Sequence, residues 1–125
     1  MRDPNQFSFK NLIVWQKAME FVSLSFDITE NIAGHFRIKE QLESASASIA
    51  QNIAEGEGRI SMKENIQYLY FARGSLYEAI TLLIVLHRKG FITEEQLAKQ
   101  ENIGLEIVKM INQLVKRKKD QLGGK

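Results

Sequence analysis

The stretch SASASIAQNIAEGEGR, residues 44–59, decides how the rest of the chain can pack. Its first half carries very small side chains on almost every side, so it predicts a slender helix that neighbouring helices can approach closely. Its second half ends in polar groups and two glycines, Gly56 and Gly58, which we expect to end the helix. One face of this helix has apolar residues at helical spacing, and these are Ile38, Leu42, Ala45, Ile49 and Ile53.

A second apolar stripe lies upstream of this stretch and predicts a helix from Leu12 to about Gly34. Its residues recur at spacings of three and four, and they are Trp15, Met19, Val22 and Phe26, with Ala18, Phe21, Ile28 and Ile32 widening the stripe. Gly34 suits the left-handed position that commonly follows a helix. Residues 1–10 lack this period, so they predict an arm with Phe7 and Phe9 as docking points.

Two more helices are predicted downstream, each introduced by a capping box. Ser61 and Glu64 begin a helix that runs from Met62 to Lys89 and ends at Gly90, with a seam of Ile66, Leu69, Leu76, Ile80 and Leu83. Thr93 and Gln96 begin the last helix, with a seam of Leu97, Gly104, Val108, Ile111 and Val115. Residues 120–125 are expected to fray. Four helices with short connectors predict one all-α domain over residues 1–125, an antiparallel up-down-up-down four-helix bundle.

Composition supports a soluble, cytoplasmic protein. The chain has 125 residues, of which 44% are apolar and 26% charged, and it has no cysteine. No apolar run approaches the ~20 residues that a membrane-spanning helix needs, and the first residues lack the apolar core of a signal peptide. Residues 79–86, AITLLIVL, are nonetheless apolar on all sides of their helix. Because one small core cannot cover every side, we expect the chain to form a homo-oligomer.

The motifs of catalysis and metal binding are missing from the sequence. His35 and His87 are the only histidines, and neither follows a Glu by three residues, the spacing that ferritin-like di-metal bundles use. An acid pair of Glu55 and Glu57 has no nucleophile beside it. We therefore expect a non-enzymatic protein with no catalytic residue, metal or cofactor. An enzyme that uses Glu55, Arg59 and Arg73 around a small ligand is the least favoured reading.

The net charge is only +2, but the cations gather in the second half of the chain. Residues 61–125 carry eleven Lys and Arg against seven Asp and Glu, whereas residues 1–60 carry six against eight. Such a cluster is typical of a surface that binds phosphates. The alternative is a helix end made cationic to suit the helix dipole. The candidate phosphate contacts are Arg59, Lys63, Lys109, Lys116, Arg117, Lys118 and Lys119.

Two groups of polar residues interrupt the apolar pattern. Asn52, Glu55 and Arg59 share one face at the end of their helix. One interpretation is a polar pocket or a contact with a partner. The alternative is an ordinary ion pair of Glu55 with Arg59, beside an Asn52 amide that bonds backbone groups at the turn. Arg73 falls in the seam of the third helix, so Arg73 and Glu78 are predicted as buried polar residues. Pairing about a turn near residue 60 puts Ala45 opposite Ser75, and it puts Glu43 and Ser44 within reach of Arg73.

The chain resembles a known family in four places. These are NLIVWQKA at residues 11–18, Gln41 with Leu42, SIAQNIAEGEGR at residues 48–59, and YFARGSLYEA at residues 70–79. Together they are similar to the 23S rRNA intervening-sequence proteins, a family that includes the accessory variability proteins of diversity-generating retroelements. The resemblance covers essentially the whole chain.

The resemblance implies an antiparallel bundle that assembles into a ring-like homopentamer without known enzymatic activity. For the retroelement branch it also implies a basic surface for RNA or DNA and a reverse transcriptase as partner. The chain departs from the family at residues 43–46, where it reads ESAS and the family often carries arginine. At these positions neutral or negative groups replace positive charge. From the resemblance as a whole and the cations of residues 61–125, we expect a module that binds nucleic acid (RNA) or a reverse-transcriptase-type partner. The alternative is a structural scaffold or adaptor that binds another protein and no nucleic acid.

Overall fold

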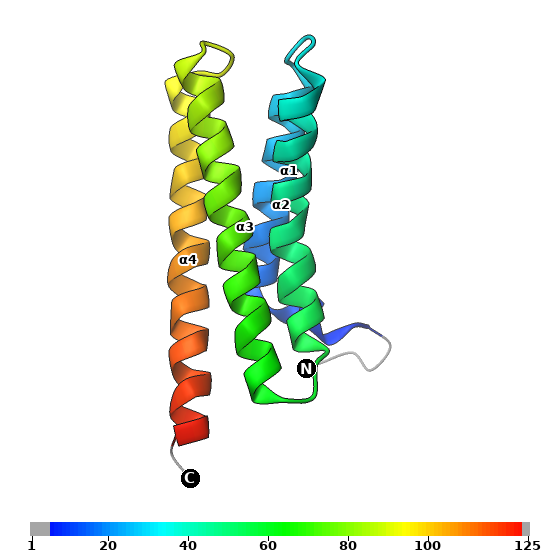
Figure 1. The fold of residues 1–125 in the computed structure, drawn as a ribbon, viewed down its shortest axis with the longest axis vertical. Coiled ribbons are helices and arrows are strands. Elements are labelled where there is room, and N and C mark those ends of the chain that lie inside the picture. Colours follow the sequence, from blue (N-terminus) through cyan, green and yellow to red (C-terminus); the bar gives the residue numbers. More distant parts are fainter. Residues whose placement is uncertain (1–5, 124–125) are drawn as a thin grey trace.

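The computed structural model describes residues 6–123, and these are helical almost throughout. A short 3-10 helix, η1 (Ser8–Asn11), precedes four α-helices, which are α1 (Ile13–Glu30), α2 (Phe36–Glu57), α3 (Met62–Arg88) and α4 (Glu94–Gly123). The prediction of an all-helical chain with four helices is confirmed, and the described residues contain no strand. In Figure 1 the chain rises along α1, descends along α2, rises along α3 and descends along α4.

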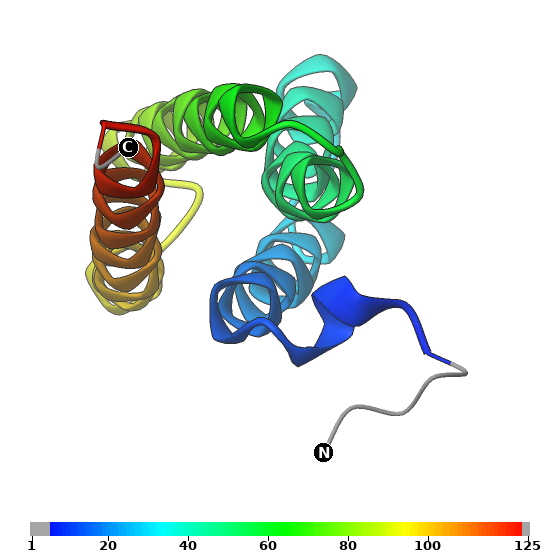
Figure 2. The same ribbon diagram turned by 90° about the horizontal axis from the view of Figure 1, so that it is seen from below.

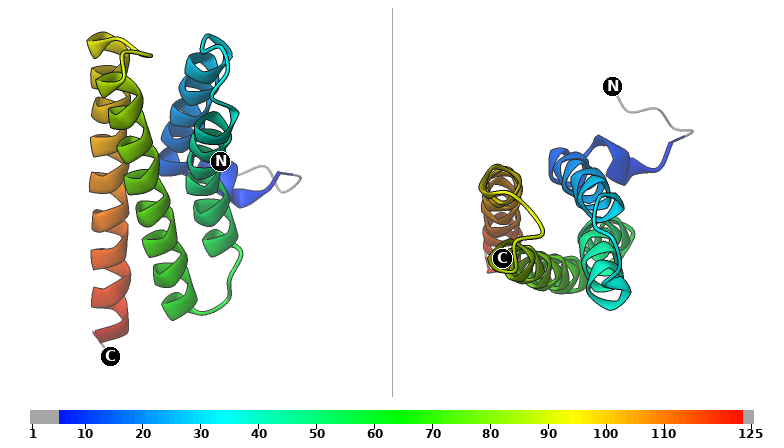
Figure 3. Two further views of the ribbon diagram at one scale, coloured as in Figure 1. Left: turned by 45° about the horizontal axis from the view of Figure 1, so that its top comes forward. Right: turned by 90° about the horizontal axis from the view of Figure 1, so that it is seen from above.

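The helices follow one another around the molecule in chain order. Viewed along their axes, α1 lies beside α2, α2 beside α3, and α3 beside α4 (Figure 2, Figure 3). Side chains of α4 also reach α1, since Gln100 Nε2 donates a 3.1 Å hydrogen bond to the Phe21 carbonyl. An ion pair of 3.4 Å between Lys17 and Glu106 links the same two helices. All four helices therefore contribute to a single core.

The small residues of α2 let α1 and α3 come close, as predicted. Ser46 is fully buried and donates a 2.8 Å hydrogen bond to Ser25 of α1. Ser48 shares a 2.8 Å hydrogen bond with Ser75 of α3. The predicted register, with Ala45 opposite Ser75, is wrong by three residues, since Ser48 meets Ser75 instead. Figure 1 shows that α3 extends below the lower end of α2, so the two helices do not end level.

Gly56 lies inside α2 and does not end it, which corrects the predicted boundary. A Cβ atom on Gly56 would lie 2.8 Å from Cβ of Tyr68, so the absence of a side chain allows this close approach of α3. Gly58 is the C-cap residue of α2. The predicted apolar face of α2 is otherwise confirmed, since Leu42, Ala45, Ile49 and Ile53 are buried.

The predicted core face of α1 is confirmed in part. Of the predicted stripe, Ala18, Phe21, Ile28 and Ile32 are buried, and Trp15 and Val22 pack partly against the core. Met19 and Phe26, also expected in the stripe, are each 38% exposed. The buried face instead takes in Val14, Ser25 and Thr29, and Ser25 fits there because Ser46 of α2 donates a hydrogen bond to it.

The helix ends follow the predicted capping chemistry. Ser61 Oγ accepts a 3.1 Å hydrogen bond from the Glu64 amide, and Thr93 and Gln96 exchange two hydrogen bonds of 2.8 and 3.1 Å. Gly34 and Gly90 both have positive φ, at 69° and 84°. Residues 120–123, expected to fray, continue α4, and residues 124–125 lie outside the described part.

The N-terminal arm is anchored in part. The Phe9 ring lies 5.1 Å from the Trp15 ring, whereas Phe7 is 73% exposed. Residues 1–5 of the predicted arm lie outside the described part of the chain. Between residues 6 and 123, α3 alone is long and apolar enough to cross a membrane by length and composition. Its residues Leu76 and Leu83 are buried in the core.

Candidate nucleic-acid interface

Arg73 lies at the surface between α3 and α4, so the prediction that it is buried in the core is wrong. It is only half-buried, and its Nη1 donates a 2.7 Å hydrogen bond to Oδ1 of Asn112 on α4. The core positions of α3 are the neighbouring Ala72 and Leu76, and Arg73 lies one step around the helix, towards α4. Glu78, the other predicted buried polar residue, is exposed because its side of α3 faces away from the core.

Two cations meet on one aromatic ring at this surface. The guanidinium carbon of Arg73 lies 4.7 Å from the centroid of the Tyr70 ring, and Lys119 Nζ lies 5.5 Å from it. Both distances are within the ~6 Å range of cation–π attraction. Tyr70 and Arg73 come from α3, Asn112 and Lys119 from α4, and we call these four residues the Tyr70 cluster.

The charge of the Tyr70 cluster is not neutralised by a carboxylate. Within residues 6–123 the ion pairs join Lys17 to Glu20 and Glu106, Arg59 to Glu55, and His87 to Glu94. Residues 109–119 of α4 hold five cations and no carboxylate. This part of the α3–α4 surface is therefore positive, with charges able to attract an anion.

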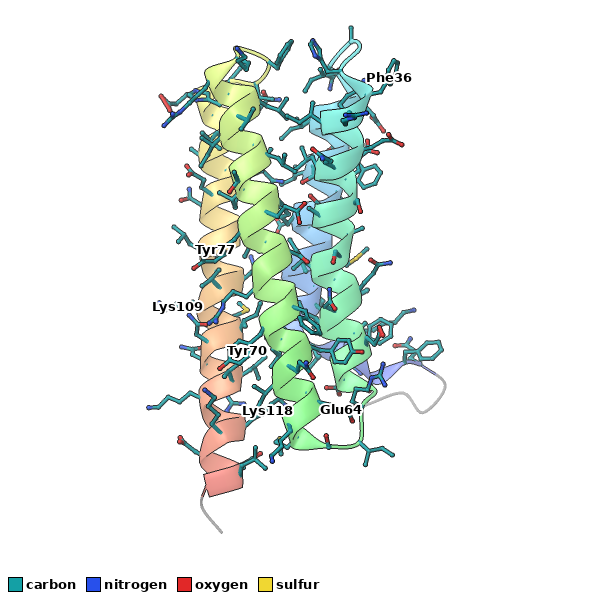
Figure 4. All side chains as sticks on the ribbon, viewed as in Figure 1. Phe36, Glu64, Tyr70, Tyr77, Lys109 and Lys118 are labelled. Carbon is teal, nitrogen blue, oxygen red and sulfur yellow. The ribbon has the colours of Figure 1, made fainter. Side chains whose placement is uncertain are left out.

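Some of the predicted cations lie beside the Tyr70 cluster. Lys109, Lys116 and Lys119 lie on the same side of α4 as Asn112, because these four residues are spaced three and four apart. All three lysines are exposed. Figure 4 shows Tyr77, Lys109, Tyr70 and Lys118 in this order down the α3–α4 pair. We call Lys109, Lys116 and the Tyr70 cluster the basic face.

The other predicted cations are separated from the basic face. Arg117 lines a hollow with Leu12 and Met110 on the α1 side of α4. Lys118 turns towards the lower end of α3, where its Nζ donates a 3.3 Å hydrogen bond to Asn65 Oδ1. Lys63 is exposed in the first turn of α3. The seven candidates therefore do not form one patch.

The polar residues at the end of α2 form internal contacts. Asn52 Nδ2 donates to the carbonyl and hydroxyl oxygens of Ser48, at 2.8 and 3.0 Å. Arg59 pairs with Glu55 at 3.4 Å and donates a 2.8 Å hydrogen bond to the Tyr68 hydroxyl. This arrangement matches the ion-pair alternative, and it leaves Arg59 less available to phosphate than Arg73.

A groove with mainly apolar walls lies above the basic face, also between α3 and α4. Its volume is about 440 Å³. Gly104 helps to form its floor, since a Cβ there would lie 3.3 Å from Ile80 Cδ1. Two of its lining residues, Tyr77 and Leu105, are 61% and 67% exposed. No group of three or more potential metal ligands occurs in residues 6–123.

The sequence and the fold are similar to those of one known family. Residues 10–113 match the 23S rRNA-intervening sequence protein family. The chain belongs to this family. A crystal structure from Bacteroides thetaiotaomicron, described as a protein of unknown function from the S23 ribosomal protein family, is 26% identical to the chain with a TM-score of 0.77. The similarity covers 83% of this chain and 99% of that one. Comparison with proteins of curated function gives no match.

Proposed function

We propose that this 23S rRNA-intervening sequence family member is a non-enzymatic, homo-oligomeric module that binds RNA through its basic face. The proposal rests on one observation above all: Arg73 and Lys119 converge on Tyr70 from two helices, and no carboxylate among residues 6–123 pairs with either of them. A guanidinium and an ammonium placed together in this way suit successive phosphates of one strand. The name of the family and the cations of residues 109–119 support RNA as the polyanion.

Self-association is the second part of the proposal. Large apolar side chains remain exposed on α1, α3 and α4, among them Ile13 at 64%, Tyr77 at 61% and Leu105 at 67%. Covering them in a symmetric assembly of antiparallel bundles would remove apolar surface from water and repeat the basic face around the symmetry axis. A pentamer in the cytoplasm is the form that the family resemblance favours. Light scattering should give a mass several times 14.3 kDa, and a monomer mass at micromolar concentration contradicts this part.

RNA binding is tested by fluorescence anisotropy with a labelled RNA of about 16 nucleotides, the upper site size of one single-strand-binding module. At ~50 mM salt we expect saturable binding that weakens steeply as salt is added. The double variant Lys116→Gln/Lys119→Gln should bind several-fold more weakly. Lys89→Gln, with one exposed lysine removed at the far end of α3, is the charge control. Absence of wild-type binding at ~50 mM salt contradicts the proposal.

A protein partner is the second candidate function, and the 440 Å³ apolar groove favours it. An amphipathic helix could place its apolar side chains between Tyr77 and Leu105 and its acidic residues against the basic face below. A reverse-transcriptase-type partner or the scaffold role both fit this arrangement. Leu105→Glu should then abolish capture of a partner from cell extract, and nuclease treatment should leave the wild-type capture unchanged.

A further inference from the structure

Tyr70 is half-buried, and its ring packs in part against the hydrophobic core at the α3–α4 surface. Its ring carries Arg73 at 4.7 Å and Lys119 at 5.5 Å. Figure 4 shows Tyr70 between α3 and α4, on the same side of the molecule as Lys109. Proteins that bind single-stranded nucleic acids combine aromatic rings with nearby cations. The bases stack on the rings, and the phosphates contact the cations.

The two cations on the ring are held very differently. Arg73 is fixed by its 2.7 Å hydrogen bond to Asn112 as well as by the ring. Lys119 is exposed, and among residues 6–123 its ammonium contacts the Tyr70 ring and forms no hydrogen bond or ion pair. Lys119 can therefore leave the ring at little cost, whereas Arg73 stays in place beside it.

The magnitudes favour replacement of Lys119 by a base. An exposed cation–π contact strengthens binding by about 2- to 5-fold, whereas stacking of a nucleic-acid base on an aromatic side chain contributes about 5- to 150-fold. A displaced Lys119 ammonium would remain close enough to meet a phosphate. The exchange thus adds a stacked base to the complex, and both Arg73 and Lys119 remain able to contact phosphates.

We infer that the Tyr70 cluster binds single-stranded RNA by stacking one base on Tyr70 while Arg73 and Lys119 contact the phosphates on either side. This rests on the proposed RNA binding and names the form of RNA. In a duplex the bases are stacked on one another, and the deep, narrow major groove of A-form RNA keeps side chains from reaching them. A duplex could meet the cations of the basic face but not the Tyr70 ring.

The test compares the full chain and its variants on an unstructured oligouridylate and on a blunt-ended RNA duplex of equal charge, at one salt concentration. Tyr70→Leu, which keeps apolar bulk for packing, should weaken binding of the single strand by about 5- to 150-fold and change duplex binding by less than about 2-fold. Tyr70→Phe should bind like the wild type. Phe71→Leu, which truncates an exposed aromatic side chain next to Tyr70 in α3 but outside the cluster, is the matched control.

The outcomes separate the inference from the proposed function. If Tyr70→Leu weakens both RNAs equally, or leaves single-strand binding unchanged, the stacking inference is wrong although RNA binding stands. If the wild type binds neither RNA at ~50 mM salt, the proposed function itself is wrong. If Tyr70→Leu fails to fold, Tyr70→Phe and Lys119→Gln decide. The inference then requires wild-type binding by Tyr70→Phe and only a few-fold loss by Lys119→Gln, and a large loss by Tyr70→Phe overturns it.

Discussion

The guanidinium of Arg73 on α3 donates a 2.7 Å hydrogen bond to Oδ1 of Asn112 on α4. The two residues are 39 positions apart in sequence, so the contact joins the last two helices at the surface of the bundle. Asn112 orients the guanidinium without neutralising it, because an amide carries no net charge. The orientation and the charge of Arg73 can therefore be changed independently.

Asn112→Asp tests whether RNA binding depends on the positive charge of Arg73, separately from the stability of the fold. The carboxylate should keep the hydrogen bond and raise the unfolding free energy by about 0.2–1 kcal/mol as a surface ion pair. RNA affinity should fall. The plot of the logarithm of the binding constant against the logarithm of the salt concentration should become shallower by about 0.7, the value of one lost phosphate contact on a single strand. Gln113→Glu makes the same charge change on the α1 side of α4. Equal effects of the two variants would indicate that only net charge matters.

Gly56→Ala tests the close approach of α2 and α3. The added Cβ would lie 2.8 Å from Cβ of Tyr68, an atom next to the α3 backbone, so the helices must move apart. We expect a loss of about 1–3 kcal/mol in the unfolding free energy. Gly74→Ala is the matched control, since nothing lies within 4 Å of its Cβ position in α3. This control should stabilise the protein by about 0.5–1 kcal/mol. Urea denaturation measures both, and an unchanged midpoint for Gly56→Ala would contradict the close packing.

The side-chain amide of Gln100 is buried, and among the described residues its nitrogen has hydrogen-bond partners but its oxygen has none. Its Nε2 donates to the Phe21 carbonyl and to Ser25 Oγ, at 3.1 and 2.9 Å. Its Oε1 is buried without a hydrogen-bond partner among the described residues. Gln100→Met loses two hydrogen bonds of about 1 kcal/mol each and removes an orphaned carbonyl that costs about 1–3 kcal/mol. The terms oppose each other, so the unfolding free energy should change by less than about 1 kcal/mol.

Gln100→Ala separates packing from hydrogen bonding at this position. It leaves a cavity between α1 and α4 as well as removing the amide, so it should cost about 2–5 kcal/mol. Thermal unfolding followed by circular dichroism compares the two variants. A loss above 2 kcal/mol for Gln100→Met would mean that Oε1 has a partner, such as an ordered water, in solution.

The salt dependence of RNA binding tests how many cations of the basic face meet phosphates. The logarithm of the binding constant should fall linearly with the logarithm of the salt concentration, with a slope of about −0.7 per contacted phosphate. Lys116→Gln/Lys119→Gln should reduce the slope by about 1.4, and Lys89→Gln should leave it unchanged. If the slopes of both variants equal that of the wild type, the phosphates lie elsewhere.

The sequence predicted those features that depend on local chemistry or on a clear period. The capping pairs at Ser61 and Thr93 and the apolar face of α2 follow from spacing within one helix. The core face of α1 could not be read in the same way, because α1 has apolar residues on several sides. Its buried face includes Ser25, whose hydroxyl is hydrogen-bonded only by residues of other helices, Ser46 of α2 and Gln100 of α4.

The Tyr70 cluster was missed because it depends on the register between two helices. Within α3, Tyr70 and Arg73 are three residues apart, and within α4, Asn112 and Lys119 are seven apart, so each pair shares a helix face. These spacings were visible in the sequence, but nothing in it fixed which turn of α4 lies beside Tyr70. Arg73 was misplaced for the same reason, since a rotation of one residue moves a side chain from the core to the edge.

The most direct test of the account is to map ultraviolet cross-links between the full chain and a single-stranded RNA by mass spectrometry. We predict cross-linked peptides within residues 64–73, which contain Tyr70 and Arg73, and within residues 109–119. Residues 18–37 of α1 and the start of α2 serve as the reference surface, and they should remain unmodified. Cross-links that concentrate in residues 18–37 and spare residues 64–73 and 109–119 would contradict the claim that the basic face binds RNA.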